Sequence, residues 1–437
     1  MRAITVTSLV FLTTTAVAAD LPRAITDGDY MSVDPLEARL GQLLFYDQIL
    51  SGNRNTSCAT CHHPRFGTSD GLSLGLGDGG IGLGPERRAD PGNPPEQRIP
   101  RNAPALFNLG AKEFTVLFHD GRIEVDPSRP SGLRTPLGEE MVAGFDSLLS
   151  AQTMFPVLSP DEMAGHYGEN EVSTAVRQGR LTGKGGAWDI IAERVRAIPE
   201  YKAGFEAADP AIESGRDLDF TDISDAIAAF MAFEWRSTDS PFDAYLAGEG
   251  GLAPKAEKGL ELFYGPAGCS ECHSGPFQTD HRFHAMGQPQ IGPGKAERFE
   301  SHFKDTGRMR VTGREADAYR FRTPSLRNVL HTGPWGHAGA YDDLEAFLRH
   351  HADPVTGLEH YEAQAVLPPL EAATDDFAPL KSERAAIAAA VSRPPVALRQ
   401  GDISALVAFL GALSDPVALG GRLGIPETVP SGLPVER

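Results

Sequence analysis

The sequence predicts a mainly α-helical protein that consists of two similar units with long irregular loops. The first observation is a repeat: the segment 41–46, Gly-Gln-Leu-Leu-Phe-Tyr, recurs as Gly-Leu-Glu-Leu-Phe-Tyr at 259–264. The second is a C-x-x-C-H motif after each copy, at 58–62 and 269–273. The third is a closing segment at 222–230 and again at 402–409, where an Asp-Ile-Ser start, predicted as a helix N-cap, precedes apolar residues at helical spacing. Each unit thus runs helix, motif, irregular middle and closing helix.

The chain begins with a segment that is typical of export. Arg2 supplies a positive charge, residues 4–17 are mostly apolar, and the run 16–19, Ala-Val-Ala-Ala, offers small residues for cleavage. A membrane anchor would need about 20 apolar residues, and this stretch is shorter. We therefore predict a signal peptide at 1–19 that is removed, and a mature protein in the periplasm.

The cysteines indicate the cofactor. All four lie in the two C-x-x-C-H motifs, which comprise Cys58, Cys61 and His62 in the first unit and Cys269, Cys272 and His273 in the second. Disulfides or a redox dithiol would not require the histidine, and zinc would need further ligands. Covalent haem explains every position, because the two thiols add to the vinyl groups and the imidazole ligates the iron. Two haems c are predicted, one in each unit.

This order of elements is the plan of a class I cytochrome c domain, here present twice. The Gly-rich stretch 246–251 suggests a boundary, with an N-terminal haem domain at 20–246 and a C-terminal haem domain at 247–437. The segment 70–85 contains G-x-G-x-x-G, but no β-strand precedes it and no βαβ unit is visible. It is therefore predicted to be a flexible loop near the first haem and not a dinucleotide site.

The charge of the chain limits its partners. The formal net charge is −19 at pH 7, which argues against nucleic acid and against anionic membranes. An acidic surface would suit a partner with a basic face, although solubility alone accounts for such a charge.

Further motifs resemble the bacterial di-haem cytochrome c peroxidases and their MauG-type relatives, over nearly the whole mature chain. The first is the spaced set Gln152, Pro156 and Glu162, which in this family lies over the open face of the N-terminal, peroxidatic haem. Splitting the O–O bond of peroxide needs a proton moved between its oxygens, and a carboxylate can act first as base and then as acid. The resemblance assigns this role to Glu162, with Gln152 orienting the peroxide and Pro156 walling the pocket. The alternative is that Glu162 only caps a helix after Ser159 and Pro160.

A second set of residues matches the calcium site of that family, which lies between the haems. Its ligands there are the carbonyl oxygens of a threonine and a proline and the side chain of an asparagine, which correspond to Thr332, Pro334 and Asn102. Oxygen donors suit calcium, so the resemblance implies one calcium ion. A turn without an ion is the alternative.

The resemblance also indicates the far ligand of the second haem. In the family it lies nineteen residues after the calcium threonine, and counting from Thr332 reaches His351. A haem held by His273 and His351 would be closed to peroxide and would have a lower potential than a His/Met haem. His350 is the ligand if the count is off by one. Met286 and Met309 stay open as methionine ligands in the second unit.

Two departures from the family bear on mechanism. Peroxidases of this group block the first haem at rest with a histidine, but residues 68–84 contain none, so this haem is expected to be open. The family also often places a tryptophan before Asp-Gly-Arg as an electron relay between the haems, where this chain has His119. Imidazole is harder to oxidise than indole. Trp335 is the alternative relay, although a packing role is favoured for it, and a structural role for His337.

The resemblance implies an enzyme that reduces hydrogen peroxide to water with electrons relayed through the C-terminal haem. The external donor would be a small cytochrome c or a cupredoxin, and a homodimer would be in keeping with the peroxidase branch. The alternative is a MauG-like di-haem oxidase that uses a ferryl state to modify a side chain of a partner protein. A third hypothesis, a protein that only transfers electrons, leaves the set around Glu162 without a role.

Overall fold

The computed structural model describes residues 21–296, 301–302, 304–371 and 375–437. Helices dominate its regular structure and the strands are two or three residues long, so the predicted mainly α-helical class is confirmed. The predicted signal peptide at 1–19 lies outside the described residues. Among the described residues, no helix combines the length and the apolar character needed to cross a membrane.

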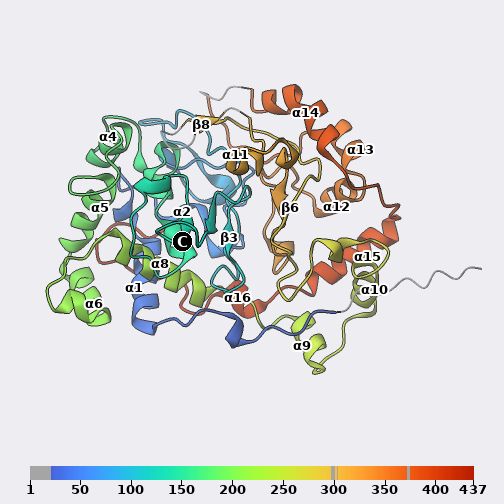
Figure 1. The fold of residues 1–437 in the computed structure, drawn as a ribbon, viewed down its shortest axis with the longest axis horizontal. Coiled ribbons are helices and arrows are strands. Elements are labelled where there is room, and N and C mark those ends of the chain that lie inside the picture. Colours follow the sequence, from blue (N-terminus) through green and yellow to red (C-terminus); the bar gives the residue numbers. More distant parts are fainter. Residues whose placement is uncertain (1–20, 297–300, 303, 372–374) are drawn as a thin grey trace, which may run out of the picture.

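The elements follow the chain in two groups (Figure 1). The helices of the first group are α1 (Pro35–Tyr46), α2 (Cys58–Cys61), α3 (Leu148–Thr153), α4 (Glu171–Arg177), α5 (Ala187–Arg196), α6 (Pro199–Ala208), α7 (Pro210–Glu213), α8 (Phe220–Glu234) and α9 (Pro241–Ala247). Those of the second group are α10 (Pro254–Phe263), α11 (Met309–Thr312), α12 (Leu344–Ala352), α13 (Pro354–Glu359), α14 (Ala378–Ala390), α15 (Gln400–Gly411) and α16 (Pro416–Gly420). The predicted boundary at 246–251 begins within the last two residues of α9 and ends before α10, and Phe242 of α9 packs in the core cluster of the second group.

Short antiparallel pairings tie the long loops together. The pairs are β1 (Gly80–Ile81) with β2 (Arg88–Ala89), β6 (Phe283–His284) with β9 (Phe321–Arg322), and β7 (Lys295–Ala296) with β8 (Ser301–His302). A three-stranded sheet contains β3 (Val116–Leu117), β4 (Ile123–Val125) and β5 (Leu133–Arg134) in that order. These ladders are too short to form a core of their own, so the helices carry the packing.

The first unit is built on the crossing of α1 and α8. Asp34 caps α1 by accepting from the amides of Leu36 and Glu37. At the crossing, a Cβ on Gly41 would lie 1.7 Å from the carbonyl oxygen of Ala226, so only glycine allows the helices this close. Beside it, Phe45 and other aromatic rings fill a core cluster that spans the whole unit.

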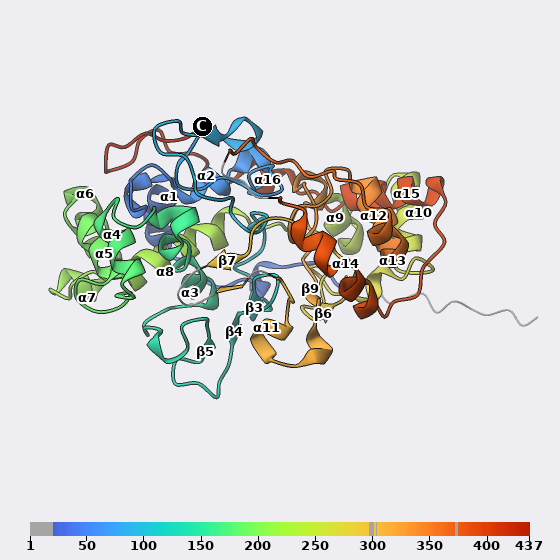
Figure 2. The ribbon, with the colours of Figure 1, turned by 90° about the horizontal axis from the view of Figure 1, so that it is seen from above.

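The second unit repeats this crossing with α10 and α15. A Cβ on Gly259 would lie 2.0 Å from the carbonyl oxygen of Ala405, and Phe263 and Phe409 pack in the adjoining core cluster. Figures 1 and 2 both show α1 with α8 at one end of the molecule and α10 with α15 at the other. The repeat in the sequence therefore corresponds to a repeated helix pair.

The starts of the closing helices differ from the prediction. Asp222 and Asp402, expected as N-caps, occupy the third helical position, and the caps are Asp219 and Arg399. Asp222 accepts from the backbone N–H of Asp219 at 2.8 Å, and Asp402 accepts from that of Arg399 at 3.0 Å. This is the reciprocal half of a capping box, which places the acidic residue one turn further in than a simple cap.

The C-terminal tail returns to the first unit. Gly424 N–H donates to Glu234 of α8 at 2.8 Å, and Gln42 of α1 donates to the carbonyl oxygen of Leu423 at 3.0 Å. Further along, Ser431 donates to Asp47 at 2.6 Å. The C-terminus accordingly lies close to α2 in Figure 2. The chain thus ends against the helices with which it began.

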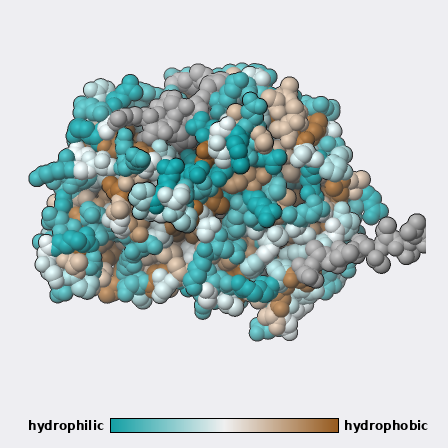
Figure 3. Space-filling view, viewed as in Figure 1, coloured by the Kyte–Doolittle hydropathy of each residue, from teal (hydrophilic) through white to brown (hydrophobic). Residues whose placement is uncertain are grey.

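The face of the molecule seen in Figure 3 is mainly hydrophilic, with hydrophobic residues scattered among the polar ones. This distribution agrees with the acidic composition of the chain and is ordinary for a folded protein surface.

Candidate active site

The two C-x-x-C-H motifs adopt the same local geometry. The N–H of His62 donates to the carbonyl oxygen of Cys58 at 2.9 Å, and the N–H of His273 donates to that of Cys269 at 2.9 Å. Each turn therefore presents two thiols and one imidazole together. None of the four cysteines is paired in a disulfide, so all four remain for attachment to a cofactor.

Both imidazoles are held in the orientation that a metal ligand requires. Nδ1 of His62 lies 3.0 Å from the carbonyl oxygen of Thr68, and Nδ1 of His273 lies 3.1 Å from that of Gln278. A ring that donates through Nδ1 keeps the lone pair on Nε2 for a metal. Burial lowers the pKa of both histidines, that of His273 to about 4, so both rings are neutral at physiological pH, as ligation demands.

One cavity of about 520 Å³ reaches both motifs. All six predicted attachment residues line it: Cys58, Cys61, His62, Cys269, Cys272 and His273. Corresponding helices supply its apolar walls, with Phe45, Ile227 and Met231 from α1 and α8, and Phe263, Leu406 and Leu410 from α10 and α15. Paired thiols, a neutral imidazole and apolar walls in each half fit two haems.

The set predicted around Glu162 lies in the same cavity. Gln152 is in α3, Pro156 begins a 3-10 turn and Glu162 is in a π-helical turn at Pro160–Ala164, and all three line the cavity with His62. The carbonyl oxygen of Ser159 accepts from three successive backbone N–H groups, those of residues 162–164, at 2.9–3.2 Å. Single π turns of this kind are frequent at functional sites.

The glycine-rich segment that follows the first motif supports the Glu162 turn. A Cβ on Gly77 would lie 2.2 Å from the carbonyl oxygen of Asp161 and 2.8 Å from Cα of Glu162. The side chain of Arg87 is buried and donates to the carbonyl oxygen of Gly77 at 2.7 Å. The segment is a loop, as predicted, but it is buried and hydrogen-bonded and not the flexible loop that its glycines suggested.

The residues predicted as candidate far ligands of the second haem have different surroundings. His351 lines the cavity, and its Nδ1 lies 3.1 Å from the carbonyl oxygen of Phe347, which leaves Nε2 available. His350 is 2% exposed, does not line the cavity, and places Nε2 at 2.9 Å from the carbonyl oxygen of Met286. Met286 itself lines the cavity, whereas Met309 begins α11 away from it.

The three residues predicted to bind calcium also line this cavity. Asn102, Thr332 and Pro334 are all among its walls. Nδ2 of Asn102 donates to the carbonyl oxygen of Leu72 at 2.7 Å, so Oδ1 is the atom that remains for an ion. The structure thus places all three residues along the same cavity, and calcium binding stays a prediction.

A stack of three rings lies in the cavity wall between the units. The ring centroids of Phe321 and His337 are 4.0 Å apart, and those of His119 and His337 are 5.6 Å apart. Burial lowers the pKa of His337 to about 3, so this ring is neutral. The other predicted relay residue, Trp335, lines the cavity, donates to the carbonyl oxygen of Val329 at 2.9 Å and packs on the second core.

The sequence analysis missed the buried carboxylate that anchors this stack. Asp305 accepts from Arg101 Nε at 2.5 Å and from His119 Nε2 at 2.7 Å. Burial by itself would raise the pKa of Asp305, but Arg101 and His119 hold it well below its usual value. Asp305 belongs to no motif, and nothing in the sequence pairs it with residues almost two hundred positions earlier.

Two motif histidines in one cavity, each with paired thiols, and the carboxylate of Glu162 in the same cavity wall define a c-type cytochrome with an enzyme-like site. A family model described as di-haem cytochrome c peroxidase matches residues 35–251. The methylamine utilization protein MauG of Methylorubrum extorquens is 29% identical over 76% of this chain and 72% of its own. The cytochrome c551 peroxidase of Pseudomonas aeruginosa is 28% identical over 74% of each.

Solved structures share the fold. A MauG-like protein associated with microbial copper homeostasis superposes with a TM-score of 0.57 at 24% identity, covering 94% of this chain and 97% of the other. The di-haem peroxidase BthA of Burkholderia thailandensis gives a TM-score of 0.56 at 21% identity, covering 97% of each chain.

The chain belongs to the di-haem cytochrome c peroxidase and MauG family. It is a peroxidase-type oxidoreductase, and membership implies two haems, in agreement with its two motifs. The resemblance inferred from the sequence is confirmed.

Proposed function

We propose that this protein reduces hydrogen peroxide to water in the periplasm, with electrons that a small donor protein supplies through the C-terminal haem. The observation that carries the proposal is the cavity that contains His62 together with Gln152, Pro156 and Glu162. An electron-transfer protein would have no use for an acid–base residue opposite its iron ligand. Two relatives named as cytochrome peroxidases match 70% and 74% of the chain.

The residues around His62 have separate tasks in this reaction. A haem attached at Cys58 and Cys61 supplies the iron at which peroxide is bound and reduced. His62 holds that iron through Nε2 while the carbonyl oxygen of Thr68 fixes its ring. Glu162 takes the proton from the near oxygen of peroxide and gives it to the far oxygen, which leaves as water. Two electrons and two protons then complete the conversion of one peroxide to two waters.

The second half of the cavity carries electrons and not substrate. We propose that His273 and His351 would both hold the second iron and so leave no position on it for peroxide. Asn102, Thr332 and Pro334 would hold one calcium ion where the two units meet, with oxygen ligands. The acidic chain would attract a donor with a basic face.

Peroxide turnover with reduced cytochrome c tests this function. Glu162→Gln keeps the size of the side chain but cannot shuttle a proton, so we expect turnover to fall by about 10²- to 10⁴-fold. Glu193→Gln is the matched control, because Glu193 is 59% exposed on α5 and its loss should leave turnover unchanged. Unchanged turnover in the Glu162→Gln protein would contradict the assigned role.

The second candidate is a MauG-like oxidase that modifies a side chain of a partner protein. Two observations favour it: residues 68–84 contain no blocking histidine, and the position that the resemblance assigns to the far ligand of the second haem holds His351 and not methionine. His119 in place of tryptophan weighs against it. Negligible peroxide turnover with several reduced cytochromes, together with peroxide-dependent oxidation of a partner protein, would establish this candidate and exclude the first.

A further inference from the structure

A second group of polar side chains lies beside the Glu162 turn. The carboxylates of Asp78 and Glu169 and the imidazole of His166 each place one ligand atom within 4.8 Å of the others. None of the three lines the haem cavity. Asp78 belongs to the glycine-rich loop, whereas His166 and Glu169 follow the Glu162 turn. The cluster therefore joins two segments that are far apart in the sequence.

Two atoms of this cluster lack the partners that buried polar atoms normally have. Asp78 is 0% exposed, and Oδ2 accepts from Asn53 at 2.9 Å while Oδ1 has no hydrogen-bond partner. Nε2 of His166 is likewise buried without a partner, although Nδ1 lies 3.3 Å from Glu169. Buried polar atoms are paired in nearly all cases. Two unpaired atoms in one cluster indicate that a ligand completes it.

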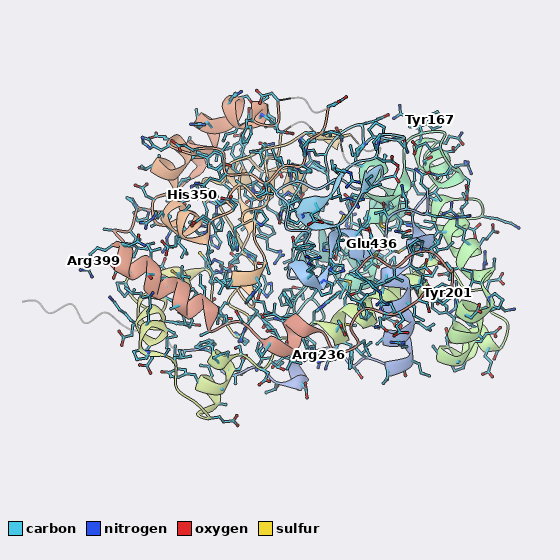
Figure 4. The ribbon with its side chains drawn as sticks, turned by 180° about the vertical axis from the view of Figure 1, so that it is seen from behind. Tyr167, Tyr201, Arg236, His350, Arg399 and Glu436 are labelled. Atoms are coloured by element: carbon cyan, nitrogen blue, oxygen red, sulfur yellow. The ribbon has the colours of Figure 1, made fainter. Side chains whose placement is uncertain are left out.

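The charge of the cluster points to a cation. The cluster places ligand atoms of two carboxylates, Asp78 and Glu169, within 4.8 Å of each other. A bound cation would stabilise both carboxylates in their charged form. The ion can reach the cluster from solvent, because the side chain of Glu169 is 23% exposed. Tyr167, next to His166, is 64% exposed and marks this outer edge of the first unit (Figure 4).

We propose that Asp78, His166 and Glu169 bind one divalent transition-metal ion, for which Zn²⁺ is the probe. Imidazole nitrogen and carboxylate oxygen are both zinc ligands, and a water can complete a tetrahedron that three residues begin. Calcium and magnesium prefer sites built from oxygen alone. This site is separate from the calcium site proposed at Asn102, which lies in the haem cavity.

The ion would strengthen the support of Glu162. The backbone N–H of Asp78 donates to the carbonyl oxygens of Glu162 and Asp161 at 3.0 and 3.2 Å. A metal on the Asp78 side chain would fix the residue whose backbone holds the Glu162 turn, and His166 and Glu169 would anchor the other end of that turn. This consequence rests on the proposed function, whereas metal binding does not.

Zinc binding to the purified di-haem protein tests the proposal. The protein is treated with a chelator, returned to excess Ca²⁺ and titrated with ZnCl₂ by calorimetry, with bound zinc measured against iron. We expect one zinc for each pair of irons. His166→Gln and Glu169→Gln should each weaken binding by at least about tenfold. His360→Gln, which removes an exposed histidine, should leave binding unchanged.

Three results would overturn the site. These are no stoichiometric zinc, as expected if water alone fills the cluster; equal zinc binding by His166→Gln and the wild type; and displacement of zinc by equimolar Ca²⁺. Glu169 is the more exposed ligand, so Glu169→Gln serves if His166→Gln does not fold. Glu162→Gln separates the two proposals, because it should abolish peroxide turnover and keep zinc binding.

Discussion

The two units of this protein share a frame, which consists of a pair of crossing helices and a C-x-x-C-H motif. They differ in the segments that line the rest of the cavity. In each, a glycine at a helix crossing brings two helices together, as Gly41 does for α1 and α8 and Gly259 for α10 and α15. In each, the motif histidine directs Nδ1 to a backbone carbonyl oxygen a few residues later, at 3.0 Å for His62 and 3.1 Å for His273. The repeat thus fixes the half of each site that holds the iron.

The opposite halves are unlike. The first unit places a buried glycine-rich loop and a π turn with Glu162 against the cavity, whereas the second places the regular helix α12 with His351 there. Under the proposed function, the carboxylate moves protons and leaves a coordination position to substrate, while the second imidazole would occupy that position. The segments between the repeated helices, and not the repeat, would then give the two haems their different roles.

The largest effect is expected from removing His351, the proposed second ligand that distinguishes the second iron from the first. His351→Ala should leave the second haem with one protein ligand, so its low-spin ferric EPR signal should become high-spin and both irons should bind cyanide. The neighbouring His350 provides the control, since its Nε2 already contacts the carbonyl oxygen of Met286 at 2.9 Å and His350→Ala should keep the low-spin signal. A low-spin signal that survives in His351→Ala would assign the ligand to Met286.

The second largest effect is a loss of stability, expected when the contact between the two units is broken at Asp305. Asp305 of the second unit accepts from Arg101 and His119 of the first, and Asp305→Asn would leave Arg101 buried without a counter-charge. Breaking a buried pair from one side costs about 3–5 kcal/mol, which a urea unfolding series would measure. Asp375→Asn is the control, because Asp375 is 51% exposed beside Lys381 and its loss should change stability little.

At acid pH, the difference in the free energy of unfolding between the Asp305→Asn variant and the wild type should disappear. The pKa of Asp305 in the folded protein is well below its usual value, because Arg101 and His119 outweigh the effect of burial. The ionised group therefore contributes its full stability above about pH 4, the ordinary pKa of aspartate. That contribution is lost as the pH falls through the lower folded pKa. A stability difference that stays constant down to pH 3 would contradict this pairing.

The sequence predicted those parts of the molecule that rest on local pattern. The helices around Gly41, Gly259, Asp222 and Asp402 follow from apolar spacing and from the repeat, and the thiol and imidazole positions follow from the C-x-x-C-H motif. The set at Gln152, Pro156 and Glu162 came from resemblance, and the structure gathers it in the cavity of His62.

Long-range contacts of irregular segments could not be predicted from the sequence. Glycines at 75–82 suggested mobility, but the space behind Glu162 admits no side chain at Gly77. The pairing of Asp305 with Arg101 and the return of the tail to Glu234 follow from no periodicity. Such contacts depend on where the whole chain folds, and a local pattern does not encode them.

The smallest effect is expected on stability when the two helix crossings that form the shared frame are altered. Gly41→Ala and Gly259→Ala would place a methyl group 1.7 and 2.0 Å from backbone carbonyl oxygens, so the crossing helices must move apart. Overpacking of this kind costs about 1–3 kcal/mol, more than the helix propensity that alanine adds. Gly401→Ala is the matched control, because Gly401 lies in α15 with nothing within 4 Å of its Cβ position. It should stabilise the protein by about 0.5–1 kcal/mol. Urea midpoints that fall for both crossing variants and rise for the control would establish that the two frames are equivalent, whereas a loss at only one crossing would show that the repeat in sequence is not a repeat in packing.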